Sequence, residues 1–181
     1  WRTLGEMVNA TAYVEHPYGW SVIGYEEDIK NWTKEDLERY FKTYYAPNNC
    51  VVVVSGNVKV DQVKQLAEKY LANIPGGPDP KPVHLVEPPQ TGERRVMVQK
   101  DVPTPYMMIG YHTPEAKHKD YYALSILSSI LSSGNSSRLY SAIVDKKQLA
   151  TAVFTDYSES FDPNLFQFYL QYSRLWQLPA L

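Results

Sequence analysis

The chain has 181 residues, 44% of them apolar and 21% charged, and a formal net charge of -2. This is the composition of a globular protein long enough for one large or two small hydrophobic cores. Nucleic acids and anionic membranes attract clustered positive charge, so this balance gives no reason to expect either as a partner. We also expect no membrane span, because no run approaches about 18 consecutive apolar residues. A chain that opens on Trp1 is expected to be a piece of a longer protein.

Residues 75–92 divide the chain. Their sequence, PGGPDPKPVHLVEPPQTG, holds six of the thirteen prolines and three of the nine glycines. Proline lacks the backbone donor and fixes its φ angle, so this segment cannot be a helix or a central strand. We therefore interpret it as a linker between two units.

The unit before the linker is predicted to be mainly helical. Apolar residues at helical spacing predict one helix that ends near Ala12 and another over 60–71. Thr33 followed by Asp36 resembles a capping box, which begins a third helix that APNN at 46–49 ends.

An apolar run follows this third helix. Residues 50–54, CVVVV, show no alternation, which favours a strand covered on both faces. In that setting the single cysteine, Cys50, is expected to be a small buried residue rather than a reactive thiol. A lone cysteine also excludes an internal disulfide.

The unit after the linker is predicted to mix strands and helices. Apolar residues alternate in 165–172, which predicts a strand with one buried face, and FDPN before it predicts a hairpin. The other expected elements are strands over 94–100 and 106–112, helices over 122–131 and from Ser136, and the first hairpin strand over 151–159. The two units together indicate an α+β protein.

The sequence shows no recognisable set of catalytic or metal-binding residues. The histidines are His16, His84, His112 and His118, and none has another histidine at the spacing that places two metal ligands on one helix face. A zinc site between His112 and His118 is the alternative to solvated surface side chains, which we favour. For His84, inside the linker, a metal role is favoured even less.

Other polar stretches also have simple structural interpretations. An anion-binding nest is one interpretation of SSGNSS at 132–137, but a helix-breaking loop needs fewer assumptions. The acidic residues 26–28 are interpreted as surface charges beside a helix start. The sequence contains no Gly-rich phosphate loop, nucleophile elbow or cysteine pair. From its residues alone, the chain has no visible active site.

The order of several motifs points further. HPYGWSVIG is followed by WTKEDLERYFKTYYAPNNCVVVVSGNV and, after the linker, by PYMMIGYHTPEAKHKDYYALSILSSILSSGNSSRLYSAI. This order of H-P-Y-G, Y-x-P-N-N, an apolar strand ending in Gly, and S-S-R-L resembles the pitrilysin/insulinase family of zinc metallopeptidases, especially its shorter bacterial and mitochondrial-processing-type members. The resemblance covers residues 5 to 170.

The resemblance implies an architecture. Family members repeat α+β domains that are joined by a linker and close like a clamshell around a peptide. The chain would then supply halves of two homologous two-layer α/β sandwiches, with mixed, mostly antiparallel sheets and helices on one face. Residues 1–74 would be the second half of the first domain, 75–92 the Pro-rich linker, and 93–181 the first half of the second, inactive domain.

The resemblance also implies where the chemistry lies. The family binds zinc through an H-x-x-E-H motif and a further downstream Glu, and the motif's own Glu activates the attacking water. The motif would lie before Trp1, and Glu6 stands too close to the H-P-Y-G bend to be the usual third ligand. His16 is expected to be a structural turn residue. We therefore expect zinc in the parent but no metal or catalytic residue in this chain, which would be inactive alone.

A departure from the family pattern concerns substrate binding. Active members carry an Arg and a Tyr, seven residues apart, that contact the substrate carbonyl from a later domain. Aligning KKQLA with the family pattern places Val144 at the Arg position and Thr151 at the Tyr position, and neither can replace those donors. Arg138 is interpreted as a structural surface arginine. The parent is therefore expected to need a second chain of the family that supplies the pair.

The leading expectation is the non-catalytic portion of a zinc-dependent endopeptidase that cleaves peptides or unfolded protein segments. Two alternatives stay open: a non-catalytic partner or scaffold subunit of the same family, and a stand-alone module that binds peptides through exposed strand edges. The expected partners are a peptide substrate and a second family subunit or another copy of the chain. The resemblance is compatible with the bacterial periplasm or cytoplasm.

Overall fold

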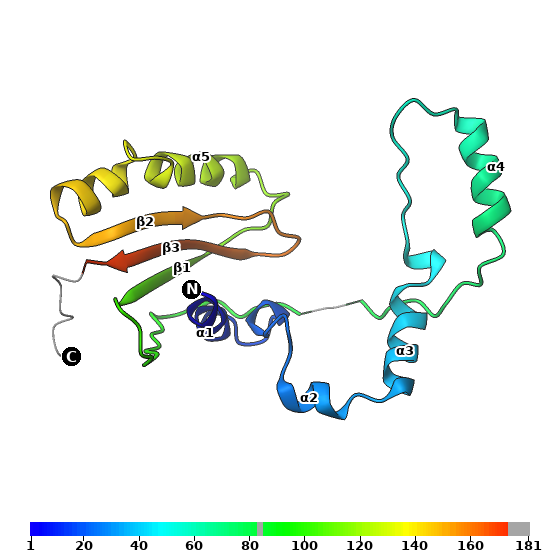
Figure 1. Ribbon diagram of the computed structural model, residues 1–181, viewed down its shortest axis with the longest axis horizontal. Coiled ribbons are helices and arrows are strands. Elements are labelled where there is room, and N and C mark those ends of the chain that lie inside the picture. The colour runs from blue at the N-terminus through cyan, green and yellow to red at the C-terminus, as the bar shows by residue number, and fades with distance from the viewer. Residues whose placement is uncertain (83–84, 174–181) are drawn as a thin grey trace. The chain divides into compact units, whose positions relative to one another are not determined.

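The computed structural model describes residues 1–82 and 85–173 (Figure 1). The chain divides into two compact units. The first, here called the sheet unit, combines residues 1–22 with the described residues from Val86 onward. The second, the helical unit, lies between them in the sequence and comprises residues 23–85, apart from the two that are not described.

The sheet unit is built on three antiparallel strands in the order β1-β3-β2. The strands are β1 (Tyr106–Thr113), β2 (Ala150–Asp156) and β3 (Asn164–Tyr172). Phe168 at the centre of β3 lies opposite Ile109 on one side and Thr155 on the other. The predicted hairpin and the predicted strand over 106–112 are thus confirmed.

One face of this sheet packs against α5 (Tyr121–Ser132) and η3, a π-helix over Tyr140–Lys146. Hydroxyl groups join the two layers: Ser128 Oγ and Ser132 Oγ each lie 2.7 Å from Thr155 Oγ1. Phe166 and Val153 are buried on this face. The two helices predicted after β1 are therefore present, although the second is wound as a π-helix.

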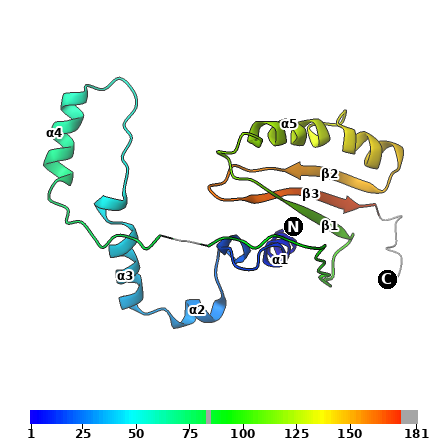
Figure 2. The ribbon, with the colours of Figure 1, turned by 180° about the vertical axis from the view of Figure 1, so that it is seen from behind.

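The other face of the sheet packs against α1 (Arg2–Ala12). In the sequence, the whole helical unit lies between α1 and β1. The Trp1 ring makes edge contacts with Tyr106, Phe154 and Tyr169, at centroid distances of 4.8, 5.5 and 5.3 Å. These rings stand on the face opposite Thr155, because neighbouring residues of a strand point to opposite faces. Figures 1 and 2 show α1 on the side of the sheet away from α5. The predicted α+β class is confirmed.

The helical unit contains α2 (Glu26–Asn31), α3 (Lys34–Tyr44), the short η2 (Pro47–Asn49) and α4 (Val60–Leu71). The capping box is confirmed: Asp36 N–H donates to Thr33 Oγ1 at 3.2 Å, and Thr33 N–H donates to Asp36 Oδ2 at 3.2 Å. Among the described residues, no helix is both long and apolar enough to cross a membrane.

Two strand predictions were wrong. Residues 50–54 are extended but have no strand partner in the described chain, and Val51 to Val54 are 88%, 67%, 83% and 50% exposed. Cys50 is exposed instead of buried for the same reason. Residues 94–100 also form no strand. A strand requires a neighbouring backbone to complete its ladder, and neither segment has one in the part of the chain that is described.

Candidate functional site

The HPYG bend is held by a hydrogen bond between the His16 side chain and the backbone of Tyr18. This side chain is buried, and its Nδ1 accepts a hydrogen bond from the Tyr18 N–H at 3.2 Å. The hydrogen-bond pattern assigns the ring hydrogen to Nε2, which lies 3.6 Å from Asp162 Oδ2. His16 therefore caps the short η1 helix (Pro17–Gly19) and faces the β2–β3 loop. This geometry supports the interpretation of His16 as a structural turn residue.

Tyrosines extend the contact between the bend and the β2–β3 loop. Tyr13 is buried, and its hydroxyl donates to Pro163 O at 3.3 Å and lies 3.4 Å from Asn164 Oδ1. Burial raises the pKa of Tyr13 well above its ordinary value, so the hydroxyl keeps its proton. The Asp162 N–H donates to the Tyr18 hydroxyl at 3.4 Å. These bonds fasten the end of α1 to the hairpin.

Glu87, from the Pro-rich segment, holds the backbone of the bend. Its carboxylate accepts the N–H groups of Val14 at 2.7 Å, Glu15 at 3.0 Å and His16 at 3.0 Å. Burial raises the pKa of the Glu87 carboxyl, but the three donors together outweigh it, so the pKa lies below the ordinary value. Charge-assisted bonds of this kind are stronger than neutral ones.

Two cations, Arg94 and Lys100, hold the segment that follows Glu87 along α1. Arg94 donates through one terminal nitrogen to Thr11 O at 3.1 Å and Ala12 O at 2.7 Å, the carbonyls at the end of the helix. A cation there also complements the negative end of the helix dipole. Lys100 Nζ donates to Thr3 Oγ1, near the start of the helix, at 3.0 Å. Residues 94–100 are therefore attached at both ends of α1.

The other end of the Pro-rich segment is attached within the helical unit. The Asn48 amide donates to Gly77 O at 3.2 Å, and its Oδ1 accepts the Gly77 N–H at 2.9 Å. The same amide donates to Asp79 Oδ1 at 2.8 Å. A Cβ added at Gly77 would lie 2.2 Å from Lys42 O, so only glycine fits. The segment is thus fastened at both ends, whereas the linker boundaries at 75–92 and the domain division stay predictions.

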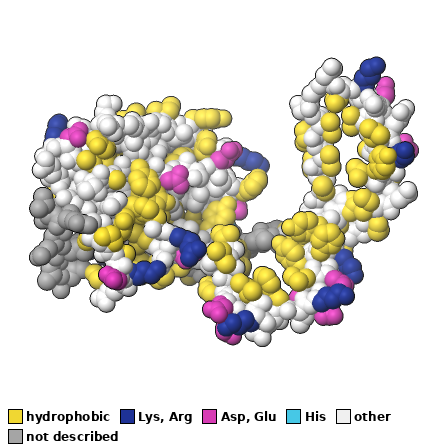
Figure 3. Space-filling view, in the orientation of Figure 1, with side chains coloured by type: hydrophobic (Ala, Val, Ile, Leu, Met, Phe, Trp, Pro, Cys, Tyr) yellow, Lys and Arg dark blue, Asp and Glu magenta, His cyan; other side chains and the backbone are white. Residues whose placement is uncertain are grey.

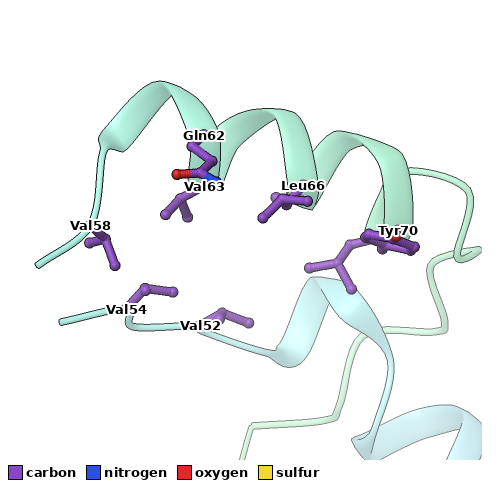
Figure 4. Close-up of a pocket in the computed structure, with 9 residues that line it drawn as sticks. Val52, Val54, Val58, Gln62, Val63, Leu66 and Tyr70 are labelled. Atoms are coloured by element: carbon purple, nitrogen blue, oxygen red, sulfur yellow. The ribbon is translucent and has the colours of Figure 1, made fainter. Parts of the chain in front are cut away.

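The helical unit also contains an open apolar groove of about 480 Å³. Val52, Val54 and Val58 face the side chains of α4 across it (Figure 4). Hydrophobic side chains follow both the extended segment and α4 in Figure 3. The full lining is Val52, Val54, Val58, Gln62, Val63, Leu66, Ala67, Tyr70 and Leu71. Such a lining offers apolar contact but no carboxylate, histidine or cysteine for catalysis.

Val144 and Thr151 lie on neighbouring elements of the sheet unit. Val144 belongs to η3 and Thr151 to β2, and the intervening Gln148 has a φ of 50°. The Thr151 hydroxyl donates to Gln171 O of β3 at 3.3 Å, so it is engaged within the sheet. Arg138 is exposed ahead of η3. That Val144 and Thr151 occupy the positions of the Arg and Tyr pair stays a prediction.

The described residues do not fit a zinc ion. In residues 1–82 and 85–173, no group of three or more His, Cys, Asp and Glu side chains is placed to hold a metal. Glu6 is exposed on α1, and His118 accepts the Asp120 N–H at 3.2 Å. His84 lies outside the described residues. We therefore derive no catalytic step through a metal in this chain.

Comparison with known proteins establishes the family. A sequence profile of the peptidase M16 inactive domain matches residues 31–175. The zinc protease PqqE of Helicobacter pylori is 41% identical over an alignment of 162 positions, which covers 87% of this chain and 36% of that protein. The crystal structure of a protease from Helicobacter pylori superposes with a TM-score of 0.84 and 38% identity, over 94% of this chain and 42% of that one.

A second relative is a probable mitochondrial-processing peptidase subunit beta of Schizosaccharomyces pombe. It is 29% identical over an alignment of 189 positions, which covers 96% of this chain and 40% of that protein. The chain therefore belongs to the M16 peptidase family, of which it carries the inactive domain. The resemblance to processing-type zinc peptidases is confirmed, and the chain spans about two fifths of the length of these relatives.

Sequence reasoning missed the residues that fasten the segments together. Glu87 and Arg94 act on backbone groups that lie far away in the sequence, so no local pattern marks them. Asn48 belongs to the Y-x-P-N-N motif, which indicates the family but does not predict that Asn48 contacts Gly77. The Gly pair at 76–77 was the available sign of a close backbone approach.

Proposed function

We propose that the parent of this chain is a zinc-dependent endopeptidase, in which this chain helps to form the chamber that binds peptides. One observation carries the proposal: the profile of the peptidase M16 inactive domain matches residues 31–175, most of the chain. A relative named as a zinc protease supports zinc in the parent. The ligands and the catalytic base would be supplied by sequence outside this chain.

The parent is further proposed to act with a second chain of the family. Val144 has no hydrogen-bond donor in its side chain, and the Thr151 hydroxyl is engaged with Gln171 O. Neither can contact a substrate carbonyl across a chamber in the way that Arg and Tyr do. The relative named as subunit beta of a processing peptidase is consistent with a subunit arrangement. The second chain would supply the missing pair of donors.

A non-catalytic partner of the same family is the second candidate function. A subunit without catalytic activity does not need the Arg and Tyr donors, so Val144 and Thr151 at those positions would suit it equally well. The two candidates differ in the sequence that precedes Trp1 in the parent. An intact H-x-x-E-H motif there favours the enzyme, and a degraded motif favours the partner.

The test is cleavage of a quenched fluorescent peptide by the purified full-length parent, alone and with its candidate partner. Activity is expected only with the partner. Substituting Val144→Arg together with Thr151→Tyr should restore activity to the parent alone by roughly 10²–10³-fold, the usual effect of such donors. The matched control, Val144→Leu with Thr151→Phe, adds similar bulk without donors and should restore none. Full activity of the unmodified parent alone, unchanged by the partner, would refute the two-chain arrangement.

A further inference from the structure

We draw no further inference here: the strongest candidate, the apolar groove between the extended segment at 50–54 and α4, is an unpartnered face, and nothing in the part of the chain that the structure describes shows what covers it.

Discussion

Replacing Glu87 with alanine should release the bend from the Pro-rich segment. The carboxylate accepts three backbone N–H groups, at 2.7, 3.0 and 3.0 Å. The N–H groups of Val14 and Glu15 belong to exposed residues, so water replaces their partner and each loss costs about 0.5–1 kcal/mol. The N–H of His16 belongs to a buried residue, and leaving it without a partner costs about 1–3 kcal/mol. The total is about 2–5 kcal/mol.

Hydrogen exchange measured by mass spectrometry on peptides that cover residues 2–22 reports this loss directly. Because a tenfold change corresponds to about 1.4 kcal/mol, protection should fall by roughly 30- to 4,000-fold. Glu93→Ala is the matched control, since Glu93 is an exposed carboxylate paired with Arg95. Surface pairs of this kind contribute little to stability, because water screens them. Equal effects of the two substitutions would refute the role given to Glu87.

The same interaction should depend on pH with a definite sign. The pKa of Glu87 in the folded protein lies below its ordinary value of 4.5, so its stabilising contribution is present above that value. The contribution is lost as the pH falls through the lowered folded pKa. Protection of residues 14–16 should therefore drop in acid in the natural chain, and the acid-dependent part should be smaller in Glu87→Gln. An identical acid profile in both proteins would contradict this assignment.

Three further predictions concern the backbone and the groove. Gly77→Ala should lower the free energy of unfolding by about 1–3 kcal/mol, because the added Cβ would lie 2.2 Å from Lys42 O. Gly76→Ala, whose Cβ would meet nothing closer than 3.4 Å, is its control in urea titrations, and equal losses would contradict the prediction. Gln148→Gly should raise the melting temperature, since glycine relieves a φ of 50° by about 0.5–1 kcal/mol net of its own entropy, whereas Lys147→Gly should lower it. A lower melting temperature for Gln148→Gly would exclude strain there. The chain should enhance the fluorescence of an apolar dye, and Val52→Ser with Val54→Ser should reduce that enhancement, because both valines line the groove. Unchanged dye binding in the double variant would place the exposed apolar surface elsewhere.

Elements encoded by local patterns could be predicted from the sequence. The capping box of Thr33 and Asp36 needs only residues three apart, and the structure contains both of its hydrogen bonds. The alternation in 165–172 likewise predicts β3, because strand periodicity is a local property. The predicted single buried face of β3 is incomplete, however, since the neighbouring residues Leu165 and Phe166, which point to opposite faces, are both buried.

Features that depend on distant partners could not be predicted. The packing of α1 on β1 joins segments that lie far apart in the sequence, and the periodicity of α1 does not indicate which element it packs against. CVVVV at 50–54 has the composition of a buried strand, yet burial depends on neighbours that the described chain does not supply. The π-helical winding of η3 has no local signal in YSAIVDK either.

The candidate site also combines features that the sequence predicts with features that only the structure reveals. The proposal that Val144 and Thr151 stand at the Arg and Tyr positions rests on the sequence alone, because it requires only the order of residues around KKQLA. The engagement of the Thr151 hydroxyl with Gln171 O required the sheet register. The fastening residues Glu87 and Asn48 act at a distance and became visible only in the fold.

The most direct test of the central claim is the zinc content and peptidase activity of this chain by itself. The purified chain would be analysed by elemental mass spectrometry and incubated with a quenched fluorescent peptide, with and without a zinc chelator. An inactive-domain portion of an M16 peptidase predicts zinc far below one ion per chain and no cleavage in either condition. One tightly held zinc per chain, with cleavage that the chelator abolishes and that His16→Ala or Glu6→Ala removes, would contradict the account.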